Sequence, residues 1–181
     1  KDTRDYHRYL GGSVTNVAMN LARLGLQPRL VATIGADGLG DYILRRINEI
    51  DIDSTYVRQL AHEPTSTVFI SRATATPDFI PYRVADAHIV EEQIPSEILQ
   101  GVKIFHTTCF ALSKNPARDT ILKKAKEAHA LGIKLSIDIN YSSKIWRDRV
   151  EAQQTIEAYC SLNPLIKVSE DDMQRYFAKT L

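Results

Sequence analysis

Two glycines stand directly before a predicted helix near the start of the chain, in the stretch Gly11-Gly12-Ser13-Val14-Thr15-Asn16. Glycine lets another molecule approach the backbone closely, and the free amides at a helix start can bind hydroxyls or anions. Asn16 lies one turn into the helix and offers both a donor and an acceptor. These residues suit a site for a polyol or an anion, although a turn, a helix cap and a solvated asparagine explain them equally well.

A second glycine-rich stretch, Gly35-Ala36-Asp37-Gly38-Leu39-Gly40, joins a predicted strand to a predicted helix. A dinucleotide-binding turn needs glycine at its first, third and sixth places, and here the third place holds Asp37. A carboxylate at that place would meet the pyrophosphate. The pattern therefore indicates a tight turn that opens a helix, and it disfavours a nicotinamide-dependent oxidoreductase.

Polar residues also follow two later strands. Asp138 and Asn140 end a predicted strand, where parallel sheets bind ligands, or they form an Asx turn that leaves the strand. Ser169 and Asp172 have the spacing of a capping box at a helix start, a structural role that is compatible with a function. The five histidines share no metal-ligand spacing, and no GxSxG nucleophile motif occurs.

The composition excludes several classes of protein. Among 181 residues, 23 Lys and Arg stand against 22 Asp and Glu, so the net charge is +1. A nucleic-acid binder would have a strong basic excess, and no apolar run approaches the ~20 residues of a membrane span. Cys109 and Cys160 form no CxxC pair, and no signal-peptide core follows Lys1. We expect a cytoplasmic protein whose partners are neither nucleic acids nor membranes.

The spacing of apolar residues predicts alternating helices and strands. Strands that alternate with helices predict an α/β fold with a doubly wound parallel sheet. Between 54 and 90 the pattern changes to short strands with no convincing helix, which indicates a small β excursion. Helices are expected at 13–24, 39–50, 116–131, 147–162 and 169–179, and strands at 29–34, 56–57, 67–71, 79–84, 103–107, 133–139 and 165–168.

Together these motifs resemble the ribokinase-like sugar kinases, the phosphofructokinase B-type carbohydrate kinase family. The stretches 11–18, 24–25 and 34–40 match the amino-terminal signature of the family with its internal distances. The resemblance covers nearly the whole chain. It continues in Pro64-Thr65, Tyr82-Arg83, Ala85-Asp86, the strand at 103–107, Asp138-Ile139-Asn140 and Lys167-Val168-Ser169.

The resemblance implies a doubly wound α/β domain with a β lid. The core would begin in 1–53, most of the lid would be 54–90, and the core would continue in 91–181. The Gly-Ala-Gly-Asp motif of the family, which carries the catalytic aspartate, does not occur in these residues, nor does its first strand. We therefore expect the amino-terminal portion of a longer kinase, inactive by itself, whose carboxyl-terminal nucleotide-binding part is absent. The resemblance also suggests a homodimer through the lid.

The resemblance also assigns substrate-binding residues. Gly11, Gly12 and Asn16 would bind sugar hydroxyls. Tyr82 and Arg83 would reach from the lid onto the substrate. The implied reaction transfers the γ-phosphoryl group of ATP, with Mg²⁺, to a sugar hydroxyl.

Further residues would lie near the phosphate. Asp138, Asn140 and Ser169 would stand close to the transferred phosphate or the nucleotide. Ser169 and Asp172 match the Asn-x-x-Glu motif that lies near magnesium in the family. Both positions depart from that motif, so any role of Asp172 toward the metal would be indirect.

The choice of sugar stays open between two groups of the family. The stretch 82–86, with Phe105-His106 and 167–169, looks like fructokinases. The stretch 138–141 looks like 2-keto-3-deoxygluconate kinases, but Ser142 stands where those have an arginine that grips the carboxylate of the substrate. We expect a neutral sugar such as fructose. A non-catalytic carbohydrate-binding or regulatory protein with a kinase-derived fold is the alternative of another class.

Overall fold

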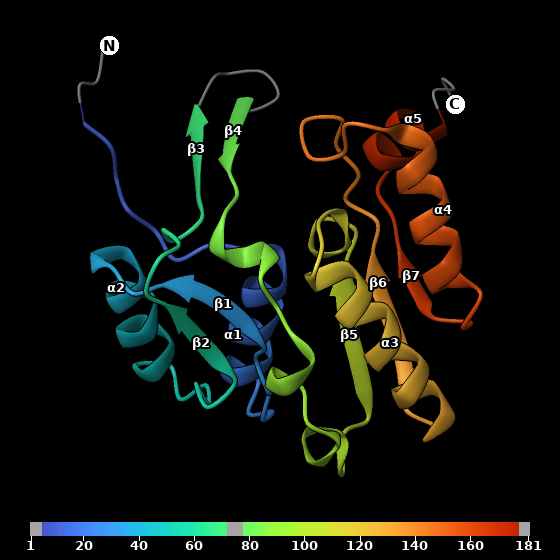
Figure 1. Cartoon of the computed structure of the whole chain (residues 1–181), viewed down its shortest axis with the longest axis horizontal. Coiled ribbons are helices and arrows are strands. Elements are labelled where there is room, and N and C mark those ends of the chain that lie inside the picture. The colour runs from blue at the N-terminus through green and yellow to red at the C-terminus, as the bar shows by residue number, and fades with distance from the viewer. Residues whose placement is uncertain (1–4, 72–77, 178–181) are drawn as a thin grey trace.

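The computed structural model of the chain describes residues 5–71 and 78–177, and Figure 1 shows how their elements are arranged. The helices are α1 (Ser13–Arg23), α2 (Gly38–Asn48), α3 (Ala117–Ala130), α4 (Arg149–Cys160) and α5 (Glu170–Phe177). The strands are β1 (Ala32–Gly35), β2 (Val57–Leu60), β3 (Thr67–Ser71), β4 (Asp78–Tyr82), β5 (Ile104–Thr108), β6 (Lys134–Asp138) and β7 (Leu165–Lys167). Short 3-10 turns include η1 (Ala85–Ala87) and η4 (Ala111–Ser113).

The described strands form two parallel sheets and one antiparallel hairpin. β1 pairs with β2, and β5, β6 and β7 form a sheet with β6 in the middle, all in parallel. β3 and β4 pair in antiparallel register, and in Figure 1 this hairpin stands out above β1 and β2. The expected α/β fold with parallel strands is confirmed.

The larger core lies between the three-stranded sheet and the helices α3 and α4. β6 alternates between two environments, because successive side chains of a strand point to opposite faces. Leu135 and Ile137 are buried in one cluster with Ile121 of α3 and Ile156 of α4, whereas Asp138 lies on the other face at the end of the strand. This alternation brings the polar end of β6 to the edge of the sheet.

A smaller core joins α1 and α2 to the β1–β2 pair. Ala18 of α1, Ile47 of α2, Leu30 and Ile52 form a buried cluster. Ala18 and Ile47 follow the helical spacing that predicts α1 and α2 from the sequence. The start of α1 is thereby fixed beside the parallel strands.

Over the described residues, the predicted elements agree with the structure within a few residues. Positions 178–179 of the helix expected at 169–179 lie outside the described residues. The strand expected at 29–34 spans Ala32–Gly35, and Arg29 makes only an isolated bridge to Asp53. The strand expected at 56–57 runs on to Leu60 and pairs with β1. Of the strands in 54–90, only β3 and β4 form the hairpin. None of the helices in the described ranges is long and apolar enough to cross a bilayer.

Candidate functional site

The glycine turn before α1 has a backbone that requires glycine. Gly12 has a φ of 105°, in the region that L side chains rarely adopt. It is the N-cap of α1 and contributes no side-chain hydrogen bond there, while its carbonyl accepts a 2.8 Å bond from the Asn16 amide. Because Gly12 provides no side-chain cap, the first amides of α1 can donate to a ligand.

A side-chain bond fastens this turn to the carboxyl end of β5. Ser13 Oγ donates to Thr108 Oγ1 over 3.3 Å, and Thr108 Oγ1 also accepts a bond from the Ala111 amide. Thr108 is the last residue of β5, so the turn lies at the edge of the parallel sheet where ligands usually bind. Asn16 is exposed, and Asn20 donates to its carbonyl from the next turn of the helix.

The residues expected to reach the substrate from the lid differ in exposure. Tyr82 ends β4 and is 57% exposed, with its ring edge-on to Phe69, 5.7 Å between centroids. Phe69 also packs edge-on against Tyr6, which precedes the glycine turn. The side chain of Arg83 is only 4% exposed. The structure thus brings Tyr82 to a surface of the hairpin and Arg83 into its base.

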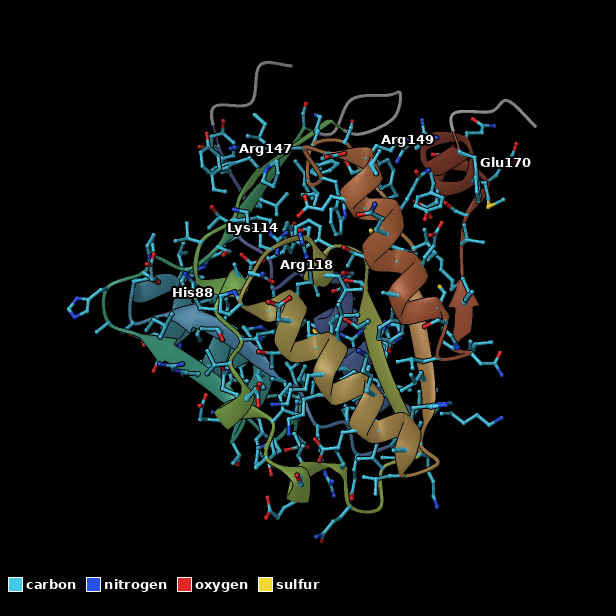
Figure 2. All side chains as sticks on the ribbon, turned by 45° about the vertical axis from the view of Figure 1, so that its right-hand side comes forward. His88, Lys114, Arg118, Arg147, Arg149 and Glu170 are labelled. Atoms are coloured by element: carbon cyan, nitrogen blue, oxygen red, sulfur yellow. The ribbon has the colours of Figure 1, made fainter. Side chains whose placement is uncertain are left out.

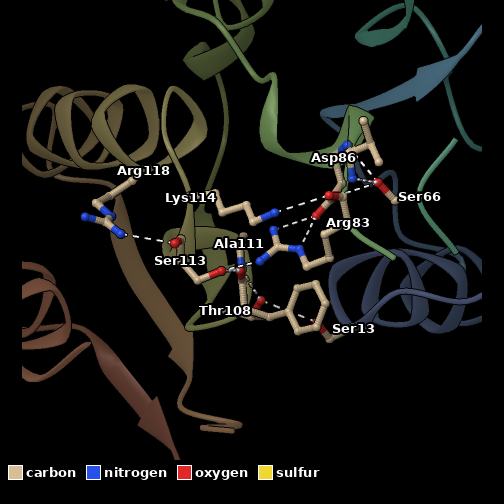
Figure 3. A network of polar contacts seen from close by, with 11 residues as sticks. Ser13, Ser66, Arg83, Asp86, Thr108, Ala111, Ser113, Lys114 and Arg118 are labelled. Carbon is tan, nitrogen blue, oxygen red and sulfur yellow. Dashed lines mark hydrogen bonds and ion pairs between the residues drawn. The ribbon is translucent and has the colours of Figure 1, made fainter. Parts of the chain in front are cut away.

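Arg83 is held by several partners within the protein. Its Nε donates to Asp86 Oδ2 over 2.7 Å, and its Nη1 donates to Ser113 Oγ. Its guanidinium lies over the Phe110 ring, 4.2 Å from the centroid. Figure 3 shows this network between the hairpin base and η4. A role toward substrate, as the resemblance implies, stays a prediction.

The carboxyl end of β6 carries an ion pair and an unsatisfied amide. Asp138 Oδ1 lies 2.9 Å from Lys167 Nζ of β7, and this bond raises the pKa of Lys167. Asn140 Oδ1 is buried and has no hydrogen-bond partner among the described residues. Buried polar atoms usually have a partner, so this oxygen could accept a bond from a ligand donor.

These residues form a row along the edge of the sheet. Thr108 of β5 stands opposite Asp138 of β6, and Asp138 stands opposite Lys167 of β7. Ser13 extends the row to the glycine turn through its bond to Thr108. Thr108 is not among the site residues predicted from the sequence, although its place directly after the strand predicted at 103–107 could have marked it.

His106 precedes Thr108 by two residues. It lies on β5, where its Nδ1 is 3.1 Å from Ser136 Oγ and burial lowers its pKa. Its Nε2 is buried and makes no hydrogen bond within the described part of the chain. A neutral imidazole with one free nitrogen can donate or accept a single bond.

Ser169 and Asp172 bind each other as the capping spacing predicts. Ser169 Oγ donates to Asp172 Oδ2 over 2.6 Å, and the Asp172 amide donates back to Ser169 Oγ. Asp172 is buried at the start of α5. Its carboxylate is engaged in the cap, and residues 5–71 and 78–177 hold no group of three metal-binding side chains. These residues by themselves do not fit a magnesium site.

The second glycine-rich stretch has a structural role. Asp37 Oδ1 accepts bonds from the amides of Leu39 and Gly40 and so caps α2, in agreement with the predicted tight turn that opens a helix. The carboxylate also binds Thr65, at the base of the hairpin, through its amide and its hydroxyl. These bonds lower the pKa of Asp37 to about 2. A side chain at Gly35 would lie 2.5 Å from the Glu63 carbonyl oxygen, so glycine is needed for this close approach.

Two hollows in the surface contain none of the predicted site residues. The larger, of about 570 Å³, lies between β2 and the segment 90–95. The other, of about 440 Å³, lies where α3 and α4 begin, and Figure 2 labels three of its basic residues, Lys114, Arg118 and Arg147. Arg118 is already bound to the carbonyls of Leu112 and Ser113 and paired with Glu151. The glycine turn and the row of polar residues beside it are therefore the better candidate site.

Sequence comparisons with known proteins point to one family. The pfkB family of carbohydrate kinases matches residues 1–181. An ATP-dependent 6-phosphofructokinase of Thermoanaerobacterium thermosaccharolyticum is 34% identical over 174 residues, which are 96% of this chain and 54% of that protein. A fructokinase of Klebsiella pneumoniae is 28% identical over 166 residues, 90% of this chain and 53% of that protein.

Solved structures give the same result for the fold. An uncharacterized sugar kinase of Pyrococcus horikoshii in complex with ATP has a TM-score of 0.90 at 26% identity, over 98% of this chain and 59% of that chain. The fructokinase of Halothermothrix orenii has a TM-score of 0.85 at 33% identity, over 97% of this chain and 63% of that chain. The fold is thus ribokinase-like, and the chain spans about half the length of the curated relatives it matches. Since the family match extends over the whole sequence, this chain belongs to the pfkB family of carbohydrate kinases.

Proposed function

We propose that the protein containing this chain is an ATP-dependent sugar kinase that phosphorylates a hydroxyl of fructose or a related sugar. The observation that carries the proposal is the bond from Ser13 to Thr108, which fastens the open amides of the Gly12 turn to the carboxyl edge of the parallel strands. Fructokinases among the relatives support the choice of sugar.

In this proposal the glycine turn binds the sugar. Gly11 and Gly12 offer backbone groups to the hydroxyls, and Asn16 offers an amide from the first turns of α1. Tyr82 and Arg83 contribute from the hairpin, which acts as a lid that excludes water from the site. A lid of this kind limits hydrolysis of ATP by water.

The phosphate would approach along the row of polar residues. Asp138, Asn140 and Ser169 stand at the carboxyl ends of β6 and β7, and the unsatisfied Asn140 oxygen supports a ligand nearby. The catalytic base and most of the Mg²⁺-ATP site would come from a part of the protein outside these 181 residues. The chain by itself is therefore proposed to be inactive, with Asp172 in at most an indirect role toward the metal.

Two alternatives remain as proposals of lower rank. The stretch Asp138-Ile139-Asn140-Tyr141 favours a 2-keto-3-deoxygluconate kinase. Against this, Ser142 stands where those kinases have an arginine that would bind the acid group of the substrate. A carbohydrate-binding or regulatory protein would keep the glycine turn and lack the catalytic base.

We further propose a homodimer through the hairpin, because Val68, Ile70 and Ile80 are exposed there. We also propose a cytoplasmic location, because both cysteines are free thiols.

A substrate screen of the full-length protein tests the proposal. Each reaction contains ATP, Mg²⁺ and one acceptor: fructose, 2-keto-3-deoxygluconate or fructose 6-phosphate, the last because of the 34% identical 6-phosphofructokinase. ADP release is measured with and without the acceptor. Fructose-dependent release supports the proposal. Release with another acceptor assigns that sugar instead, and binding of sugar without ADP release favours the non-catalytic alternative.

A further inference from the structure

The two ends of the β3–β4 hairpin are held by one carboxylate. Ser66, which precedes β3, donates to Asp86 Oδ1 over 2.5 Å, and its hydroxyl accepts bonds from the amides of Val84 and Asp86. Arg83, which follows β4, donates to Asp86 Oδ2 and forms an ion pair with the same oxygen. Asp86 therefore closes the hairpin at its base.

Arg83 then connects this base to the core. Its Nη1 donates to Ser113 Oγ, and its guanidinium stacks on Phe110. Lys114 Nζ donates to the Arg83 carbonyl over 3.2 Å. With a side chain only 4% exposed, Arg83 is placed as a buried connector between the hairpin base and the segment 108–113.

The segment 108–113 contacts the glycine turn at its other end. Thr108, at its start, accepts the bond from Ser13, and Ser113, at its end, accepts the bond from Arg83. Ser113 also donates to the Phe110 carbonyl over 2.8 Å, which closes η4 on itself. Figure 3 shows these bonds leading from Ser13 across η4 to Arg83 and Asp86.

We propose that Arg83 is a positioning residue that fixes the hairpin relative to the Gly12 turn, through Ser113 and the segment 108–113. This rests on the proposed function in that the turn and the hairpin enclose a sugar. The role is separate from any direct contact of Arg83 with substrate, because its donors reach Asp86 and Ser113 of the same chain. Loss of the bond to Ser113 frees the base of the hairpin and leaves the turn itself intact.

Hydrogen–deuterium exchange of the full-length, sugar-free protein tests this. Ser113→Ala removes the acceptor of the Arg83 bond without touching the turn. Arg83→Lys keeps the charge and loses the planar fork that binds two partners. Ser161→Ala is the matched control, since Ser161 donates only within the end of α4, to the Ala158 carbonyl. Both test variants should raise exchange in peptides covering β3 and β4 by about tenfold, with α4 unchanged.

A kinetic measurement adds a second readout. In Ser113→Ala the KM for sugar should rise on the order of fivefold while the KM for ATP stays constant, because only the lid over the sugar has moved. Hairpin exchange in Ser113→Ala equal to that in Ser161→Ala overturns the proposal, as does an effect confined to Arg83→Lys. If the wild-type protein phosphorylates no sugar, the proposed function fails, and the exchange comparison still decides the role of Arg83.

Discussion

Asp37 and Thr65 hold each other through two hydrogen bonds, although 28 residues separate them along the chain. The carboxylate of Asp37 accepts the Thr65 amide and the Thr65 hydroxyl, each over 2.8 Å. The same carboxylate caps α2 through Leu39 and Gly40. One side chain thus fixes both the start of a core helix and the first end of the hairpin.

The acid stability of the protein should depend on Asp37. Its pKa falls from 3.8 to about 2, first through the Thr65 amide bond. Because the folded-state pKa lies below the unfolded one, the stabilisation is complete above about pH 4 and is lost as the pH falls toward 2. Asp37→Asn should flatten this dependence in urea unfolding, and Asp37→Ala should cost about 1–2 kcal/mol at pH 7. The control is Asp119→Asn, at an exposed position in the first turn of α3, which should leave the pH dependence of the unfolding free energy unchanged. An equal change in both Asn variants would contradict the assignment of the acid stability to Asp37.

Substitution by alanine should affect stability differently at Gly40 and at Gly38. A Cβ at Gly40 would overlap the Gly35 carbonyl oxygen, and rigid backbone cannot move aside. Gly40→Ala should therefore lose about 2–3 kcal/mol of unfolding free energy. Gly38→Ala meets nothing within 4 Å at the start of α2 and should match the wild type or gain about 0.5 kcal/mol. Thermal unfolding of the two variants side by side checks this, and similar Tm values for both would refute the close approach.

Asn16 should contribute to the binding of sugar and contribute little to the binding of ATP. Asn16→Ala in the full-length protein removes a donor and an acceptor from the proposed site, so the KM for sugar should rise about tenfold, which corresponds to 1.4 kcal/mol. The KM for ATP should stay within error. Asn20→Ala is the matched control one turn further along the exposed side of α1. Equal effects on both substrates, or none, would remove Asn16 from the sugar site.

The two cysteines should differ in reactivity. Cys109 is fully buried, accepts a bond from Trp146 Nε1 over 3.0 Å, and burial raises the pKa of its thiol to about 12. Cys160 is only half-buried. Since the thiolate is the nucleophile, iodoacetamide at pH 8 should label Cys160 first and Cys109 only after unfolding. Mass spectrometry of peptides from native and urea-treated protein measures this; early labelling of Cys109 would contradict its burial.

The sequence predicts the regular elements well, because their periodicity is local. α3 is expected at 116–131 and spans Ala117–Ala130, and β3 is found as expected at Thr67–Ser71. The pairing of β2 with β1 cannot be predicted in this way, because the partner of a short strand depends on contacts that form only in the assembled fold. The sequence pattern places that strand with the lid and coincides with it only at its first residue, Val57.

The site is harder to predict than the elements. The glycine turn at Gly12 can be read from residue types, because a positive φ and a helix start leave a local pattern. The burial of Arg83 cannot, since it depends on Asp86, on Phe110 and on Ser113, which is 30 residues away. Charged residues are rarely buried without partners, and the partners become visible only in three dimensions.

The polar side chains that fasten the base of the hairpin lie outside its strands. Asp37, Thr65, Ser66, Arg83 and Asp86 all lie outside Thr67–Ser71 and Asp78–Tyr82. These polar contacts do not depend on the side chains of the strands, so a longer, shorter or differently charged insert can be placed between the same two ends where it keeps the packing of Phe79 on the larger core. Selection for a new acceptor could act on such an insert without rebuilding the α/β body beneath it.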